Sequence, residues 1–175
     1  MKVFFIADTH FGDSNILRYE NRPFSDVEQM DSTLIKNWNN TVSKDDKVFL
    51  VGDFSEYGFE KSHEICQQLN GEKFLVMGNH DFQNEKYYYD CGFDSVSRYP
   101  IIYENFWIIS HEPLYINRNM PYANIFGHVH ANPLYKDVSE QSFCVSAERI
   151  NYTPVEFSEI KLRMKGCNLN EKGIS

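Results

Sequence analysis

Short apolar runs that end in small groups of polar residues recur along this chain and constrain its fold more than any other feature. The runs span 3–6, 48–51, 74–77, 106–109 and 125–126. Runs of this length, bounded by Gly, Asp, Asn and His, are typical of buried strands in an α/β sheet. Residues that act on ligands collect beyond the carboxyl ends of such strands. We therefore expect one sheet edge to gather the polar residues after the runs, which are Asp8, His10, Asp53, Asn79, His80, His111, His128 and His130.

The lone pairs of so many imidazoles and carboxylates would repel one another unless cations lay among them. Asp8 and His10 are two residues apart, which places both on the same side of an extended segment, where one cation can take both. Asp53 has two carboxylate oxygens and can bridge two cations about 3.5–4 Å apart. The nitrogen and oxygen donors suit Mn first, with Fe, Zn, Ni or Co as alternatives, better than Mg or Ca. A water that bridges two such cations loses a proton near neutral pH and becomes a nucleophile, so the pattern predicts a two-metal hydrolase.

Strand and helix patterns alternate in the first half of the chain, and short strands dominate the second half. The first predicted helix opens with a capping box of Ser25 and Glu28 and covers 27–38. Two more predicted helices cover 60–69 and 84–89. Further predicted strands cover 96–99, 101–103, 143–145 and 155–160. This order favours one α/β domain over residues 1–160, with two packed sheets flanked by helices. Residues 161–175 are expected to form a partly frayed C-terminal tail.

Composition and charge narrow the class of partner. The chain has 175 residues and a net charge of −8, which disfavours an extended nucleic-acid interface, because nonspecific affinity depends on Lys and Arg. The four cysteines are widely spaced and contain no C-x-x-C pair, which favours free thiols in a reducing compartment. No signal-peptide pattern and no apolar stretch near the ~20 residues of a membrane span occur, so we expect a cytoplasmic protein without a membrane partner. Oligomeric state stays open.

The polar groups, in their order along the chain, resemble the calcineurin-like metallophosphoesterase superfamily. The motifs are Asp8-x-His10, Gly52-Asp53, Gly78-Asn79-His80-Asp81, His111 and Gly127-His128-x-His130. The stretch 9–24, with Thr9-His10-Phe11-Gly12 and Arg22-Pro23-Phe24, is similar to a branch of small bacterial and phage phosphoesterases. The resemblance implies a four-layer α/β/β/α sandwich with a dinuclear site.

The resemblance also implies a role for each motif residue. One metal would be held by Asp8, His10, Asp53 and His130, and the other by Asp53, Asn79, His111 and His128. His80 would be the catalytic histidine. The sequence leaves open whether Glu56 or Asp81 orients it, so both are candidate catalytic residues. Tyr57 stands where the protein Ser/Thr phosphatases of this superfamily carry an arginine that binds phosphate, so a protein-phosphatase role is disfavoured.

Two arginines follow the first metal loop and are candidate ligands of a substrate phosphate. Arg18 and Arg22 could each donate to phosphate through a bidentate guanidinium, and surface pairing with Glu20 or Asp26 is the competing interpretation. His63, the sixth histidine, lies on a predicted helix away from every motif and is interpreted as a surface residue.

Together these features predict a metal-dependent phosphohydrolase that acts on a phosphomonoester or a phosphodiester. The expected substrate is small, phosphorylated and nucleotide-like, and a metal-bridging hydroxide is the expected nucleophile. Two alternatives remain at this point: a nuclease that acts on short nucleic-acid ends, and a metal-binding scaffold without catalytic activity.

Overall fold

The computed structural model describes the backbone of residues 1–171 and the side chains of residues 1–166. Its elements, in chain order, are β1 (Val3–Ile6), α1 (Ser14–Tyr19), α2 (Val27–Thr41), β2 (Lys47–Leu50), α3 (Phe59–Gln68), β3 (Glu72–Val76), α4 (Glu85–Cys91), β4 (Ser95–Ser97), β5 (Ile101–Tyr103), β6 (Trp107–Ser110), β7 (Ala123–Phe126), β8 (Ser142–Cys144), a 3-10 helix η1 (Ala147–Ile150), β9 (Val155–Glu156) and α5 (Phe157–Glu171).

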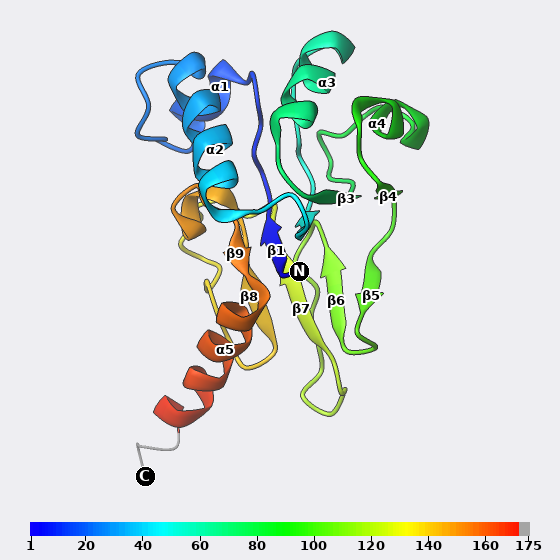
Figure 1. Cartoon of the computed structure of the whole chain (residues 1–175). Coiled ribbons are helices and arrows are strands. Elements are labelled where there is room, and N and C mark those ends of the chain that lie inside the picture. The colour runs from blue at the N-terminus through cyan, green and yellow to red at the C-terminus, as the bar shows by residue number, and fades with distance from the viewer. Residues whose placement is uncertain (172–175) are drawn as a thin grey trace.

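Two mixed sheets form the centre of the molecule, as predicted. The first has the order β4-β3-β2-β1-β9, in which β1 to β4 are parallel and β9 is antiparallel to β1. The second has the order β5-β6-β7-β8, with β6, β7 and β8 parallel. In Figure 1 the helices α2, α3 and α4 lie above the first sheet, and strands β5 to β8 lie below it.

Alternation along β1 shows how the sheets are packed, because successive side chains of a strand point to opposite faces. Phe4 and Ile6 pack with Met30, Leu34 and Trp38 of α2, on the helix-covered face. The opposite face of the first sheet packs against the second sheet. The apolar residues of that inner cluster include Phe5, Phe49, Val51, Trp107, Ile109, Ile125 and Phe143.

The structure corrects the predicted C-terminal segment. The strand expected over 155–160 ends at Glu156, and α5 begins at Phe157 and runs through Glu171, across the boundary predicted at residue 160. Phe157, Ile160 and Met164 recur at helical spacing and are buried in the cluster between the sheets. The helix therefore joins the fold through an apolar face, and residues 172–175 of the predicted tail lie outside the described residues.

Two details near the N-terminus differ from expectation. The residue that caps α2 is Asp26, whose carboxylate accepts from the backbone of Gln29, so the predicted Ser25 cap is wrong by one position. The short helix α1 was not predicted, and Asp13 caps it by accepting from the backbone of Asn15. Within residues 1–171 the structure contains no helix with the length and apolar character of a membrane span.

Candidate metal centre

The parallel strands of both sheets end at the same place, and their loops form the candidate site. Ala7 lies between the sheets, because its backbone N–H donates to Val145 and the backbone N–H of Asp8 donates to Gly52. The loop after β7 joins them, since the backbone N–H of His128 donates to both carboxylate oxygens of Asp8 at 3.0 and 2.9 Å. Backbone N–H groups thus donate hydrogen bonds between loops that are distant in sequence.

Backbone strain marks the same residues. Asp8, His10, Asp53, His128 and His130 all have positive φ, between 45° and 70°. Residues other than glycine rarely adopt this left-handed region, and such residues persist where the surrounding structure imposes them, as it does at ligand sites. Five strained residues in one cluster, all of them predicted ligands, indicate a site shaped for binding.

Two glycines allow the loops to approach one another. A Cβ atom at Gly78 would overlap the carboxylate of Asp53, and one at Gly127 would overlap the side chain of Ala7. Neither glycine has a positive φ, so the requirement here is space and not backbone freedom.

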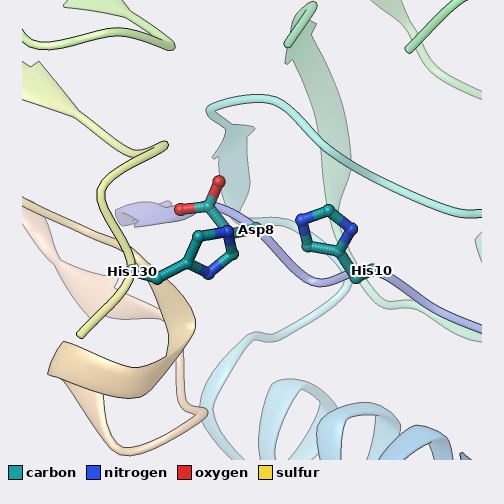
Figure 2. A group of neighbouring side chains, drawn as sticks. All are labelled: Asp8, His10 and His130. Atoms are coloured by element: carbon teal, nitrogen blue, oxygen red, sulfur yellow. The ribbon is translucent and has the colours of Figure 1, made fainter. Parts of the chain in front are cut away.

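The first group of candidate ligands is Asp8, His10 and His130. Each offers one ligand atom, and these atoms lie within 4.8 Å of one another. Figure 2 shows the Asp8 carboxylate near the two imidazole rings, which come from separate loops. His10 is 1% exposed, and neither of its ring nitrogens has a hydrogen-bond partner among the described residues. A buried polar side chain without partners is costly, and a cation would satisfy it.

The second group lies around Asn79. Its Oδ1 atom is 2.9 Å from Nε2 of His111 and 2.8 Å from Nδ1 of His128, and these two nitrogens are 3.2 Å apart. His111 directs its other nitrogen at the carbonyl of Val51, at 2.9 Å. In neutral His111 that nitrogen carries the proton, which leaves a lone pair on Nε2 beside the oxygen of Asn79. Lone pairs that converge in this way suit a shared cation.

Asp53 lies between the two groups. Its Oδ2 atom is 3.4 Å from Nε2 of His10 and 3.3 Å from Nε2 of His111. Burial alone would raise the pKa of this carboxyl, but the two imidazoles outweigh burial and hold the pKa well below its usual range. Asp53 is thus an ionised carboxylate in the position that a bridging ligand requires. The residues present fit two divalent cations in donor type and arrangement.

His80 is paired with Glu56. Its Nδ1 atom is 2.8 Å from Oε1 of Glu56, and both side chains line one cleft. Asp81, the other candidate for orienting His80, is directed elsewhere. Its buried carboxylate accepts from the backbone N–H groups of Asp53, Phe54 and Gly78, so its role is to hold the loops after β2 and β3 together. The catalytic assignment of Asp81 is corrected accordingly.

Arg22 is structural and is not available to a substrate. It is 4% exposed, and its guanidinium donates to the backbone carbonyls of Asp8 and Thr9 and to the carboxylate of Glu148. The predicted phosphate contact is therefore wrong, and so is the alternative pairing with Glu20 or Asp26. Arg22 instead holds the backbone of the first metal loop.

Glu148 also lies at the site, although the sequence pattern did not predict it. Its Oε1 atom is 3.1 Å from Nδ1 of His130 and also accepts from Arg22. Burial alone would raise the pKa of Glu148, but His130 and Arg22 lower it to about 2. A carboxylate on the outer nitrogen of a histidine fixes its tautomer and orients the ring toward a metal. Glu148 also follows an apolar run, 143–145, so the pattern that revealed the other residues could have included it.

The cleft beside the site has a volume of about 540 Å³. Its lining includes His10, His80 and His130, the acidic residues Asp13, Glu20 and Glu56, and residues of α1. Among the described side chains, no Lys or Arg lines this cleft. Arg18 is exposed on α1 and donates to its neighbour Asn15, so it is not brought to the site. His63 lies on α3, with its Nδ1 3.1 Å from the carbonyl of Asp90, away from the site as expected.

Known proteins are similar to this chain in sequence. A family model described as calcineurin-like phosphoesterase matches residues 1–161. An uncharacterized protein of Methanocaldococcus jannaschii is 40% identical over an alignment of 175 positions. The alignment covers 94% of this chain and 93% of the relative. The Gene 66 protein of Mycobacterium phage L5 is 35% identical over 82 residues, which cover 45% of this chain and 39% of the phage protein.

Solved structures share the fold. A protein of unknown function from Aquifex aeolicus superposes with a TM-score of 0.70 at 25% identity, covering 91% of this chain and 97% of that one. The Pseudomonas putida nuclease MPE has a TM-score of 0.51 at 19% identity, covering 73% of this chain and 60% of the nuclease, which supports the fold alone. The chain belongs to the calcineurin-like phosphoesterase family and is a metal-dependent phosphoesterase.

Proposed function

We propose that this chain is a phosphodiesterase that uses two divalent cations, Mn foremost, to hydrolyse a small nucleotide-like diester. The observation that carries the proposal is the charge of the cleft. Asp13, Glu20 and Glu56 line it, and no described Lys or Arg does.

The charge of the substrate follows from the charge of the cleft. A phosphomonoester carries close to two negative charges at neutral pH, whereas a diester carries one. Sites for dianionic phosphate commonly use Arg, because its guanidinium binds two oxygens at once. Here Arg22 is committed to Glu148 and to backbone carbonyls, so the cations alone would offset the substrate charge. A diester suits that balance better.

The two cations, when bound, would orient the phosphate and lower the pKa of an attacking water. The ligands proposed for one cation are Asp8, His10, Asp53 and His130, and those for the other are Asp53, Asn79, His111 and His128. His80 would give a proton to the departing alkoxide, which is a poor leaving group without one. Glu56 would hold the His80 ring in place through Nδ1. A cytoplasmic location and a small-molecule substrate belong to the same proposal.

The nuclease alternative rests on the fold that this chain shares with the Pseudomonas putida nuclease MPE. A polynucleotide brings a phosphate at every step, and each would meet the acidic cleft and a chain of net charge −8. A small diester avoids that repulsion, so it is the preferred substrate class. The silent-scaffold alternative is disfavoured by the paired His80 and Glu56, which ligand binding alone does not require.

The test is hydrolysis of bis-p-nitrophenyl phosphate, a diester, against p-nitrophenyl phosphate, a monoester. The protein is first stripped with a chelator, and Mn, Ni, Zn or Mg is then added back singly at pH 7–9. We expect metal-dependent turnover that favours the diester. Turnover of the monoester alone would contradict the proposal, and binding of metal without turnover of either substrate would favour the scaffold.

Two histidine variants sharpen this assay. His80→Ala is expected to lower kcat by roughly 10²–10⁴ on a nucleotide diester with an alkoxide leaving group, the usual contribution of general acid–base catalysis, and by less on bis-p-nitrophenyl phosphate, because p-nitrophenolate leaves without a proton. His63→Ala is the matched control, because it removes an imidazole on α3 that is outside the site. Equal activity of the two variants on the diester with an alkoxide leaving group would exclude the role assigned to His80.

A further inference from the structure

Two large aromatic side chains near the cleft are left almost uncovered by the fold. Tyr19, at the end of α1, is 77% exposed, and Phe82, two residues after His80, is 75% exposed. Neither ring is part of the apolar clusters that hold the described residues together. Both rings are therefore free to contact a ligand at the cleft.

The two rings are associated with different histidines of the site. The ring centroid of Phe82 is 5.8 Å from that of His80. Tyr19 lines the cleft beside Glu20, whose carboxylate accepts from the backbone of Ala131, directly after His130. The His10 ring is next to both histidines, with centroid distances of 4.9 Å to His80 and 5.3 Å to His130. One aromatic ring thus accompanies the His80 side and the other the His130 side.

A phosphodiester has two organic groups that leave the phosphorus in different directions, whereas a monoester has one. With phosphate at the metal groups around His10, one organic group would extend past His80 and the other past His130. No described cation is available in the cleft to bind either group by charge, whereas an aromatic ring binds planar groups by stacking.

We propose that Tyr19 and Phe82 stack on the two organic arms of the diester, so that the substrate is a nucleotide diester with a planar group on each side. This rests on the proposed function. Phe82, beside the proton donor His80, contacts the leaving group, and Tyr19 contacts the nucleobase of the retained nucleotide. Asp13 and Glu20, on the Tyr19 side, repel any further phosphate, which limits the retained arm to a single nucleotide.

The experiment compares two diesters with the same leaving group. One is the p-nitrophenyl ester of thymidine 5′-monophosphate, and the other is methyl p-nitrophenyl phosphate. Since p-nitrophenolate leaves from both, the ratio of their kcat/KM values reports only the retained group. The variants are Tyr19→Ala and Phe82→Ala, with Tyr19→Phe and Phe82→Tyr as controls that keep an aromatic ring.

For the wild type we expect a preference for the thymidine ester of ~10-fold or more, the range that base stacking supports. Tyr19→Ala should abolish this preference, and Tyr19→Phe should retain it. Phe82→Ala should lower kcat/KM for both esters by a similar factor and leave the ratio unchanged, and Phe82→Tyr should restore the rate. An unchanged ratio in Tyr19→Ala, or an unchanged rate in Phe82→Ala, would overturn the respective half of the proposal.

Failure of the proposed function would look different, because the wild type would then hydrolyse neither ester. In that case calorimetric binding of thymidine 5′-monophosphate to the Mn-loaded protein decides the inference about Tyr19. Binding that is lost in Tyr19→Ala and kept in Tyr19→Phe supports base stacking. Equal binding by the wild type and Tyr19→Ala, or no binding at all, contradicts it.

Discussion

The chemistry of the site depends on a few side chains held by unusual backbone. Asp8, His10, Asp53, His128 and His130 adopt left-handed conformations, and polar groups with unused lone pairs converge among them. Such strain persists only where the surrounding contacts impose it. Arg22 and Asp81 supply such contacts, because both bind backbone groups of the metal loops.

The pair of His80 and Glu56 is testable by a double-mutant cycle. Glu56→Gln should lower kcat with little change in KM, because Glu56 acts through His80 and not on bound substrate. The same substitution in a His80→Ala background should have no further effect on kcat. Glu60→Gln, in the first turn of α3, is the control. Additive losses in the double variant would show that Glu56 acts independently of His80.

Glu148 is expected to act on metal affinity. Glu148→Gln should weaken Mn binding by about 10–100-fold, the usual effect of removing the partner of a metal-binding histidine. Calorimetric titration of the metal-free protein measures this, and exposed Glu140 provides the control Glu140→Gln. A thermal melt of each variant confirms that it folds. Unchanged Mn affinity in folded Glu148→Gln would refute the positioning role.

At the residue scale the sequence predicted which side chains come together, because apolar runs place them at strand ends. It could not separate Asp81 from Glu56 as the partner of His80. Asp81 follows His80 directly, and Glu56 lies in the stretch that begins with Gly52-Asp53, so both are acids that could reach His80. Only the folded loop shows that the Asp81 carboxylate accepts from three backbone N–H groups. Arg22 was misassigned for a related reason, since its partner Glu148 is 126 residues away.

At the scale of elements, strands were easier to predict than helix ends. The apolar runs gave β1, β2 and β3 to within two residues, because burial on both faces leaves little else possible. The segment 155–160 was predicted wrongly because Val155 and Glu156 pair with β1 before a helical face begins at Phe157. Short α1 has a single buried residue, Ile16, which is too little periodicity to detect.

The packing of α5 gives a stability prediction. Met164→Ala should lower the free energy of unfolding by about 2–5 kcal/mol, because the side chain is buried between the sheets. Leu162→Ala on the same helix is the control and should change it by less than about 0.5 kcal/mol, since Leu162 is 70% exposed. Urea denaturation of the metal-free protein measures both. Equal effects would mean that α5 does not pack as described.

At the scale of the whole molecule, the candidate metal centre lies where the two sheets meet. Ligand loops follow β1, β2 and β3 of the first sheet and β6 and β7 of the second. Bound cations would therefore add a further link between loops that hydrogen bonds of Asp81 and Asp8 already join. The order of the elements predicted two packed sheets. It did not predict which strands of the two sheets come together, because that depends on contacts such as the hydrogen bond from Ala7 to Val145.

Metal should consequently stabilise the folded protein. A ligand at 100 times its dissociation constant contributes about 2.7 kcal/mol per site, so Mn should raise Tm and a chelator should lower it. The shift should shrink in His128→Ala, which removes one proposed ligand, and should persist in His63→Ala. Thermal melts with and without Mn measure this. A Tm that does not respond to Mn would argue against metal binding by the folded chain.

The most direct test of the central claim is the number and proximity of bound Mn ions. We would titrate the metal-free protein with Mn and record the electron paramagnetic resonance spectrum at each step. Two Mn per chain with an exchange-coupled spectrum are predicted, because Asp53 lies between the two ligand groups at 3.3–3.4 Å from a histidine of each. Fewer than two Mn per chain, or two with the spectra of isolated ions, would contradict the dinuclear centre on which the proposed function depends.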